Sequence, residues 1–276
     1  MKGVATRPAQ RRDGTHFDDL IAVEEPLEIR AASEPVSITM RTPGNDAKLA
    51  IGFLYSEGII RSLADVGTVS HCGHPGEEGY GNVIEVTPAS GTHWPLERAE
   101  AARRGTLTTA ACGVCGRRQI EDLISRVPVV GNDSSLSAQL LAGGPDQLAA
   151  LQKNFADTGG THAAVVLAAD GTRLAGYEDV GRHNAVDKVI GDLLLSGRIG
   201  VGTMLMVSGR SSFEIVQKAA MARIPVVASV SAASSLAIDL AQKANITLVA
   251  FVRGKGFNVY THATRLTDSL STIRQE

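Results

Sequence analysis

Two cysteines, Cys112 and Cys115, lie between glycines in the stretch TTAACGVCGRRQIEDL. This Cys-x-x-Cys spacing serves three kinds of chemistry: metal binding, disulfide exchange and the carriage of sulfur. The flanking glycines favour an accessible loop, and Arg117 and Arg118 favour the ionised thiol. A thiolate can accept a sulfane sulfur as a persulfide and pass it on by displacement at sulfur. The stretch therefore has the residues that a sulfur carrier needs.

Two other uses of the cysteine pair have to be weighed. A structural zinc site needs four ligands, and the chain holds one such pair. His71, Cys72 and His74 could supply the rest, but adjacent side chains cannot easily face one metal, so a zinc-stabilised protein is a weaker alternative. A thioredoxin-like pair lies after a strand of a βαβ unit, a setting that this region lacks. The Pro-Cys-x-x-Cys and His-x-Glu motifs of cytidine deaminases are also absent.

A second polar block, EDVGRHNAVDKVIG, opens a stretch with helical periodicity. Asn184 and Asp187 share one polar arc of the predicted helix, and His183 lies at the border between this arc and an apolar stripe. A histidine at such a border is either a structural residue or a functional one. The spacing alone leaves both interpretations open.

Small and hydroxylated residues follow three predicted strands, in the segments SGRSS from Ser208, SVSAASS from Ser229 and RGKG from Arg253. In parallel sheets, ligands bind beyond the carboxyl ends of the strands, where helix N-termini offer free amide hydrogens. Arg210, Arg253 and Lys255 can neutralise phosphate there. Serine and glycine are ordinary at any single turn, but the three ends together predict a site for an anion, namely a nucleotide phosphate.

The elements that position these residues are regular in the second half of the chain. Asp170-Gly171 predicts a hairpin between AAVVLAA and TRLAGYE, and an apolar stripe predicts a helix over residues 182–196. After it, strands and helices alternate as βαβαβ, with a Ser211 to Glu214 capping box on the first of these helices. This order predicts parallel strands with right-handed crossovers.

The first half has a mixed pattern. LEIRA and VSITMR predict two strands, and a helix follows from Asn45 to about Gly58. DVGTVS and NVIEVTP predict two further strands, and residues 131–146 predict a linker. The predicted organisation is a disordered tail over residues 1–19, a small α+β domain over 20–130 that ends in a mobile loop with the cysteine pair, and an α/β domain over 131–276.

Composition excludes several classes of function. The net charge of the 276-residue chain is −2 and only 4% of its residues are aromatic, which disfavours nucleic acid as a partner. No apolar run approaches the roughly 20 residues of a membrane-spanning helix, so no membrane association is expected. The odd number of cysteines, three, predicts free thiols in the reducing cytoplasm.

Five motifs taken together carry a resemblance to a known family. They are ACGVCG, EDVGRHNAVDKVIG, VSGRSSFEIVQKA, SAASSLAIDLA and VRGKGFNVYTH. Over residues 20–262 the chain resembles the formate dehydrogenase accessory sulfurtransferase family, FdhD. The block around His183 is the most specific of the five. The resemblance implies a second domain with a cytidine deaminase-like α/β fold that lacks zinc chemistry, and it implies a homodimer.

The resemblance also implies a function. Such proteins take sulfur from a cysteine desulfurase as a cysteine persulfide and deliver it to the molybdenum cofactor, in its bis-guanine dinucleotide form, before insertion into formate dehydrogenase. Cys112 and Cys115 match the sulfur-carrying pair, with Cys112 expected to hold the persulfide, and no permanently bound metal is expected. The candidates for cofactor binding are Arg182, His183, Asn184, Asp187, Ser208, Gly209, Arg210, Ser234, Arg253 and Lys255.

A different class of function remains open. A chaperone that holds the molybdenum cofactor for handover would also bind guanine nucleotide, but its cysteines would never carry sulfane sulfur. The sequence leaves open which molybdenum or tungsten enzyme is served, how the desulfurase docks and which cysteine receives sulfur first.

Overall fold

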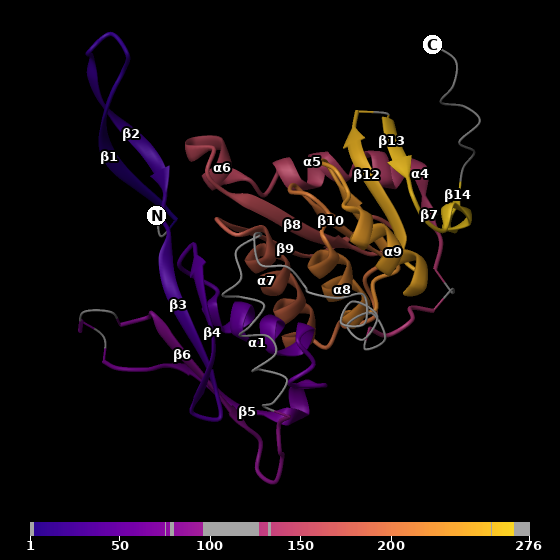
Figure 1. Ribbon diagram of the computed structural model, residues 1–276, viewed down its shortest axis with the longest axis horizontal. Helices are drawn as coiled ribbons and strands as arrows, with labels where there is room; N and C mark the ends of the chain where they lie inside the picture. The colour runs from indigo at the N-terminus through magenta and orange to yellow at the C-terminus, as the bar shows by residue number, and fades with distance from the viewer. Residues whose placement is uncertain are drawn as a thin grey trace.

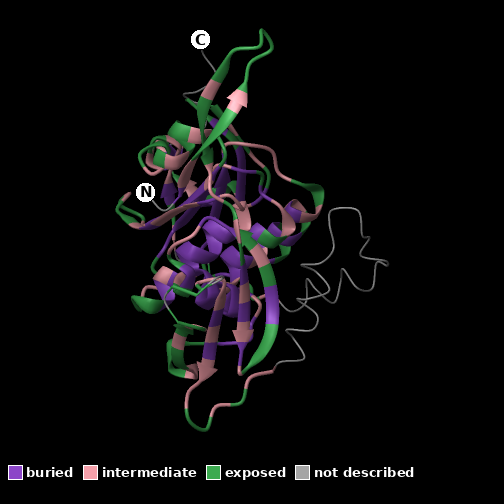
Figure 2. Cartoon of the chain, turned by 90° about the vertical axis from the view of Figure 1, so that its left-hand side faces the viewer, coloured by how far each residue is buried: buried purple, intermediate pink, exposed green. Residues whose placement is uncertain are grey.

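The computed structural model describes residues 3–74, 76–77, 80–95, 127–131, 134–254 and 256–267. These residues form a projecting hairpin, a four-stranded sheet and a six-stranded sheet, with helices packed between the two sheets (Figure 1). The buried residues concentrate in these central helices and the strands beside them, whereas the tips of the hairpins are exposed (Figure 2). The residues between the sheets therefore form one continuous apolar core.

The N-terminal hairpin, called the arm below, pairs β1 (Val4–Gln10) with β2 (His16–Ala22) in antiparallel register. Its turn is closed by a hydrogen bond from Arg11 N to Thr15 O at 2.9 Å, and Gly14 has a φ of 89°. The base of the arm packs against α6 (Lys153–Thr158). The prediction of a disordered tail is therefore wrong for residues 3–19. The stretch is polar and has no apolar alternation, and its strands form through backbone pairing.

The small sheet has the order β4-β3-β6-β5, with β3 parallel to β6 and the other two pairs antiparallel. Its predicted strands and the predicted helix are confirmed, and Gly58 has the left-handed φ of 69° expected after a helix end. The elements are β3 (Glu25–Ala31), β4 (Glu34–Arg41), α1 (Asp46–Ser56), the 3-10 helix η1 (Leu63–Asp65), β5 (Val66–His71) and β6 (Val83–Pro88).

The large sheet has the order β13-β12-β11-β10-β8-β9. The predicted hairpin and the predicted βαβαβ order are confirmed, with β10, β11 and β12 parallel. The strands are β8 (His162–Leu167), β9 (Arg173–Asp179), β10 (Met204–Val207), β11 (Val226–Ser229), β12 (Thr247–Arg253) and β13 (Gly256–Val259). The helices that follow β9, β10 and β11 are α7 (Arg182–Leu195), α8 (Phe213–Met221) and α9 (Ser235–Lys243).

The opposite face of the large sheet is covered by a segment that was expected to be a linker. Residues 134–149 contain β7 (Leu136–Ser137), α4 (Ala138–Ala142) and α5 (Gly144–Ala149). Leu141 and Leu148 bury against alternate residues of the strands and form a second apolar cluster. β7 pairs with β14 (Leu266–Thr267), which follows the 3-10 helix η2 (Ala263–Arg265). The linker prediction is therefore wrong here, because turn-forming residues alternate with buried leucines.

Helices α1 and α7 cross at two glycines. A Cβ atom on Gly52 would lie 1.8 Å from the backbone oxygen of Asp187, and one on Gly191 would lie 1.9 Å from the backbone oxygen of Lys48. Only glycine permits two helix backbones to approach this closely. The crossing joins the small sheet to the large one. No helix within the described parts of the chain is long and apolar enough to cross a membrane.

Candidate functional site

The cysteine pair and one cofactor candidate lie outside the described residues. These are Cys112, Cys115 and Lys255. The third cysteine, Cys72, is a free, partly buried thiol whose backbone N–H donates to Val83 O. The neighbouring His71 directs Nε2 toward Asp46 Oδ2 at 3.5 Å. The other candidates are described, and most of them lie where the strands of the large sheet end.

Four strands of the large sheet end at one edge. β10, β11 and β12 are parallel, and β9 runs in the same direction because β8 is antiparallel to both β9 and β10. Helices α7, α8 and α9 begin there, so their free N–H groups gather at what we call the carboxyl edge. This arrangement, visible in Figure 1, is the setting that the sequence predicted for an anionic ligand.

The loops at the carboxyl edge are bound to one another. Ser211 N donates to Ala232 O at 3.0 Å, and Ser234 N donates to Ser211 O at 3.1 Å. Arg253, at the end of β12, donates from Nε to Val230 O at 3.1 Å. The three predicted strand ends therefore do converge. Arg210, Ser234 and Arg253 are exposed at this edge.

The first helical turns use serines differently from the prediction. Ser234 is the N-cap of α9, and its side chain accepts a hydrogen bond from Ala237 N at 3.3 Å. Ser212 is the N-cap of α8 and makes no side-chain capping hydrogen bond, so the capping box predicted from Ser211 to Glu214 is wrong. Ser211 instead extends the parallel pairing, in a bridge with Ala233. Its hydroxyl is thereby free of a capping role.

Arg182, Ser208 and Gly209 lie together around a residue that the sequence analysis missed, His162. A Cβ atom on Gly209 would lie 3.2 Å from Arg182 Cδ and 3.5 Å from His162 Nδ1. Ser208 Oγ accepts from Ala163 N at 2.9 Å and lies 3.5 Å from His162 Nδ1. The predicted hairpin could have indicated His162. Its antiparallel register pairs His162, at the start of β8, with Asp179, at the end of β9, so both lie at the carboxyl edge.

His183 points toward the start of α8. Its Nε2 lies 3.2 Å from Ser212 Oγ and 3.8 Å from Glu214 Oε2. Burial and the positive charges of Arg182 and Lys218 lower the pKa of His183 to about 4, although Glu214 opposes this shift. Burial and Arg182 also lower the pKa of His162. Both imidazoles are therefore neutral at pH 7.

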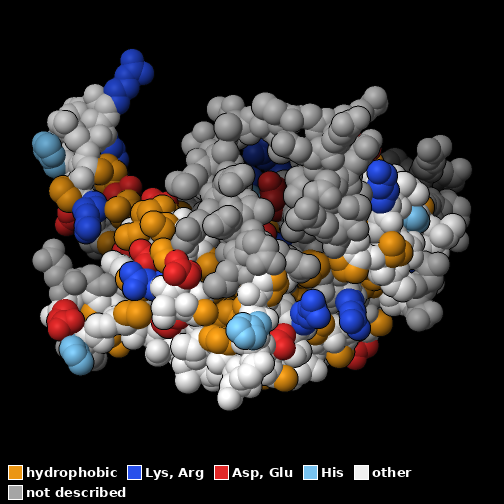
Figure 3. Space-filling view, turned by 60° about the horizontal axis from the view of Figure 1, so that its bottom comes forward, with side chains coloured by type: hydrophobic (Ala, Val, Ile, Leu, Met, Phe, Trp, Pro, Cys, Tyr) orange, Lys and Arg blue, Asp and Glu red, His pale blue; other side chains and the backbone are white. Residues whose placement is uncertain are grey.

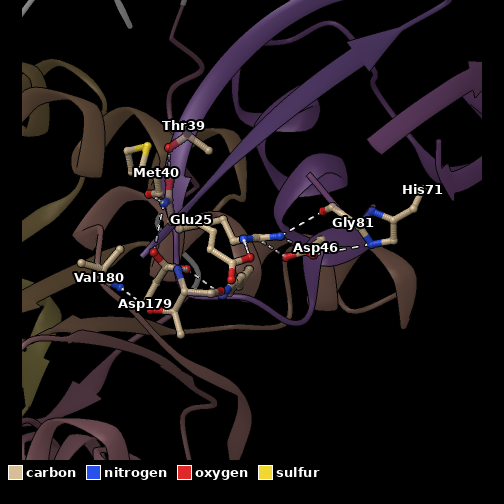
Figure 4. A network of polar contacts seen from close by, with 12 residues as sticks. Glu25, Thr39, Met40, Asp46, His71, Gly81, Asp179 and Val180 are labelled. Atoms are coloured by element: carbon tan, nitrogen blue, oxygen red, sulfur yellow. Dashed lines mark hydrogen bonds and ion pairs between the residues drawn. The ribbon is translucent and has the colours of Figure 1, made fainter. Parts of the chain in front are cut away.

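Asn184 holds the carboxyl edge against the small sheet. Its Nδ2 donates to Met40 O at 2.7 Å and to Asp179 Oδ1 at 3.0 Å, while Thr39 Oγ1 donates to Asn184 Oδ1 (Figure 4). Its amide is thus fully engaged within the protein. The position supports a structural role for Asn184 at the contact between the sheets, and gives no support to its predicted role as a cofactor ligand.

Asp187 is also committed to the interior. Lys218 Nζ donates to its two carboxylate oxygens at 2.7 and 3.0 Å, and Ser56 Oγ donates to Oδ1 at 3.2 Å. The polar block around His183 therefore divides in two. Arg182 and His183 lie at the carboxyl edge, whereas Asn184 and Asp187 face α1 and the small sheet.

Two further ion pairs fix the end of β4 beside this edge (Figure 4). Lys188 Nζ lies 2.6 Å from Asp179 Oδ2 and donates to Thr42 O, and both charged side chains are buried. Arg41 donates from Nε to Asp46 Oδ1 at 3.0 Å. Buried charges of this kind need their partners, so they tie the strand to α7 and α1.

The described charges are mixed on the visible face of the molecule in Figure 3. On the face shown in Figure 3, the described acidic and basic side chains are mixed with apolar ones, and no broad field of one sign covers them. The net charge of −2 agrees with this picture.

This chain is similar to known proteins over most of its length. Residues 22–267 match the FdhD/NarQ family. A sulfur carrier protein FdhD from Anaeromyxobacter sp. (strain K) is 52% identical over 270 residues, which cover 95% of this chain and 93% of the relative. One from Mycobacterium tuberculosis (strain ATCC 25618 / H37Rv) is 49% identical over 258 residues, which cover 90% and 92%.

A solved structure shares the fold. The crystal structure of a formate dehydrogenase accessory protein from Desulfotalea psychrophila matches with a TM-score of 0.73 and 23% sequence identity, and the match covers 96% of this chain and 98% of that one. The family resemblance inferred from five motifs is confirmed by the match over residues 22–267 and by relatives that share about half of their residues with this chain. The chain belongs to the FdhD/NarQ family.

Proposed function

We propose that this chain is a sulfur carrier, with sulfurtransferase activity, in the maturation of formate dehydrogenase. It accepts sulfane sulfur from a cysteine desulfurase as a persulfide on Cys112. It then passes the sulfur to the molybdenum cofactor, in its bis-guanine dinucleotide form, before the cofactor enters the enzyme. The observation that carries the proposal is that the Cys112 and Cys115 pair lies inside the family match, and that the relatives are described as sulfur carrier proteins.

Loading of the carrier is a displacement at sulfur. The thiolate of Cys112 attacks the outer sulfur of the donor persulfide, the S–S bond of the donor breaks and the donor cysteine leaves as a thiolate. A new S–S bond forms on Cys112. No electrons are gained or lost overall, so this step needs no oxidant or reductant.

Delivery of the sulfur requires two electrons, because a sulfido ligand is more reduced than sulfane sulfur. Cys115 can supply them by attacking the inner sulfur of the Cys112 persulfide. The outer sulfur then leaves as sulfide and a disulfide joins the two cysteines, which a cellular thiol reduces afterwards. This requirement explains why a carrier would have two cysteines at this spacing.

The carboxyl edge supports binding of the cofactor by its phosphates. Guanine dinucleotides carry pyrophosphate groups, and three helix N-termini meet at this edge together with Arg182, Arg210 and Arg253. The same proposal includes that the chain forms a homodimer in the cytoplasm and holds no resident metal. It also includes that the second domain has a cytidine deaminase-like fold.

The second candidate is a chaperone that holds the cofactor without carrying sulfur. It is favoured by the same feature, since a phosphate site at the carboxyl edge would function without the cysteines. Both candidates predict binding of guanine nucleotide. Only the sulfur carrier predicts a persulfide.

Mass spectrometry after incubation with a cysteine desulfurase and cysteine separates the two candidates. We expect one added, reductant-sensitive sulfur atom on the peptide that contains Cys112 and Cys115. The adduct should persist in Cys72→Ala and be absent in Cys112→Ala. Unmodified peptide, with the desulfurase active on a control acceptor, would favour the chaperone.

A further inference from the structure

Helices α1 and α8 meet through a hydrogen bond, an ion pair and a cation–π contact. Tyr55 of α1 donates from its hydroxyl to the backbone oxygen of Met221, the last residue of α8, at 3.0 Å. Lys218 Nζ of α8 lies 3.9 Å from Glu57 Oε1 and 5.8 Å from the centre of the Phe53 ring. Lys218 is therefore the charged group that joins α8 to the end of α1.

This ammonium group serves two carboxylates. Lys218 Nζ donates two hydrogen bonds to Asp187 of α7, and the same nitrogen pairs with Glu57. A third carboxylate, Glu214, precedes Lys218 by about one turn on α8, and its charge also acts on Glu57. Lys218 is the cation among the described residues whose charge acts on Glu57. The junction thus carries more negative than positive charge when all three carboxylates are ionised.

Glu57 has the least favourable position of the three for a negative charge. It is the C-cap of α1, at the negative end of the helix dipole, and the last turn of α1 has no basic residue. Asp187 accepts hydrogen bonds from Lys218 and Ser56, and Glu214 lies in the first turn of its helix. Burial and the charges of Asp187 and Glu214 raise the pKa of Glu57, and Lys218 opposes this shift. Glu57 is therefore the group that holds a proton most readily.

The ion pairs of the junction differ in their access to water. The Glu57 side chain has 25% of its surface exposed, whereas Lys218 and Asp187 have 6% and 4%. Glu57 can therefore exchange its proton with solvent. Once ionised, its carboxylate is better solvated in water than in the junction. A turn of this side chain toward water removes its contact with Lys218 and leaves Lys218 paired with Asp187.

We propose that Glu57, Lys218 and Asp187 form a proton-controlled latch between α1 and α8. When Glu57 is protonated, its neutral side chain stays in the junction. When Glu57 releases its proton to water, its side chain turns outward and the end of α1 loosens from α8, while Asp187 still joins α7 to α8. Because α8 begins at the carboxyl edge, the latch connects a proton on the helix of the small sheet to the candidate site. The latch does not depend on the cysteine pair.

Hydrogen-deuterium exchange of the full chain, read by mass spectrometry, tests the latch. The wild type is compared with Glu57→Gln at each pH, because the intrinsic pH dependence of amide exchange cancels in the ratio of their rates. Glutamine represents the protonated acid and cannot ionise. As the pH rises from 4.5 to 8, exchange in residues 55–60 should become about threefold or more faster in the wild type than in the variant, since the local opening there becomes easier.

Residues 46–52 provide an internal control, because the glycine crossing holds them against α7. Their exchange should be equal in the wild type and Glu57→Gln at every pH. A ratio for residues 55–60 that stays constant with pH would overturn the latch. A ratio that grows equally in both segments would also overturn it, because Glu57 would then act on the stability of the whole chain.

Two further variants make the test specific. Glu34→Gln removes an exposed carboxylate from the same sheet and should follow the wild type at every pH. Tyr55→Phe removes the hydroxyl contact with Met221, so it should increase exchange in residues 55–60 at pH 4.5 as well as at pH 8. Loss of the pH dependence in Glu34→Gln would show that a general charge effect causes it, and would overturn the assignment to Glu57.

Discussion

Lys218 of α8 donates two hydrogen bonds to the carboxylate of Asp187 on α7, and both side chains are buried. Burial by itself lowers the pKa of Lys218, but the charges of Asp187 and Glu57 outweigh it and raise the pKa above its ordinary value. The lysine is therefore charged. Ser56 of α1 also donates to Asp187. The pair therefore holds α7 and α8, which both begin at the carboxyl edge, against α1, the helix of the small sheet.

Replacing this lysine should destabilise the whole chain. Lys218→Met leaves the carboxylate of Asp187 buried without its cation, which we expect to cost about 3–5 kcal/mol in the free energy of unfolding. Denaturant unfolding measures the change. The double variant Lys218→Met with Asp187→Leu should recover most of the loss, and a single variant as stable as the wild type would contradict the proposed importance of the pair.

Glu57 should make stability depend on pH. Burial raises the pKa of Glu57, Lys218 opposes the shift, and Asp187 and Glu214 add to it, so the folded-state pKa lies above the ordinary value of 4.5. The folded chain then holds this proton more tightly than the unfolded chain does. The stabilisation is present below pH 4.5 and is lost as the pH rises through the folded-state pKa.

Glu57→Gln tests this linkage, because the amide cannot ionise. The Tm of the variant relative to the wild type should rise between pH 4.5 and pH 8. A difference in Tm that stays constant over this range, or that falls, would show that Glu57 is not shifted in this direction.

Binding of an anion at the carboxyl edge should be linked to proton uptake by His183. The ring faces Arg182 on its own helix, Lys218 and Glu214 on α8, and His162 on β8. An anion that neutralises Arg182 removes part of the repulsion that lowers the pKa of His183 to about 4, so the bound state takes up protons more readily.

The ratio of GDP affinities between the wild type and His183→Gln reports this linkage, since the titration of the ligand's own phosphate cancels in the ratio. The advantage of the wild type should grow as the pH falls from 7 to 5. A ratio that does not change with pH would separate His183 from the ligand.

The helix crossing should not tolerate a methyl group. Gly191→Ala places a Cβ atom 1.9 Å from the backbone oxygen of Lys48, and we expect a loss of about 3 kcal/mol in the free energy of unfolding. Gly143→Ala is the matched control, because its nearest neighbour lies at 3.6 Å and its φ is −78°. Equal stability of the two variants would refute the close approach of the helices.

Cys115 should be needed for the release of sulfur and not for loading. Cys115→Ala is expected to accept a sulfur atom on Cys112 and to retain it, because no second thiol can displace sulfide. Sulfide assays after loading, with Cys72→Ala as the control, measure the release. If Cys115→Ala released sulfide as fast as the wild type does, another thiol would have to reduce the persulfide.

The sequence predicted those elements whose periodicity matches their burial. The apolar stripe of α7 has helical spacing, and the strands from Met204 onward are continuous apolar runs that are buried on both faces of the sheet, so these two patterns located them. The arm has neither pattern. Its strands depend on backbone pairing, and Pro8 within β1 argues against a strand, so periodicity could not detect it.

The site was predicted in part for similar physical reasons. Small residues after parallel strands indicated Ser208 and Gly209, because the topology of such sheets fixes where strand ends meet. Asn184 and Asp187 were predicted as cofactor ligands because they belong to the most specific block of the family resemblance, and their polar arc on the helix has no visible partner in the sequence. Their partners, among them Met40 and Lys218, come from distant segments and become visible only in the folded chain.

The arm has a further consequence for the behaviour of the protein in solution. Within the described residues, β1 and β2 pair only with each other, so each has an outer edge that could pair with a strand of another molecule. Pro8 offers no N–H on one edge, and the cross-strand pair of Arg7 and Asp19 places charges along the ribbon. The same proline and charges that hide the arm from sequence patterns protect it from edge-to-edge aggregation.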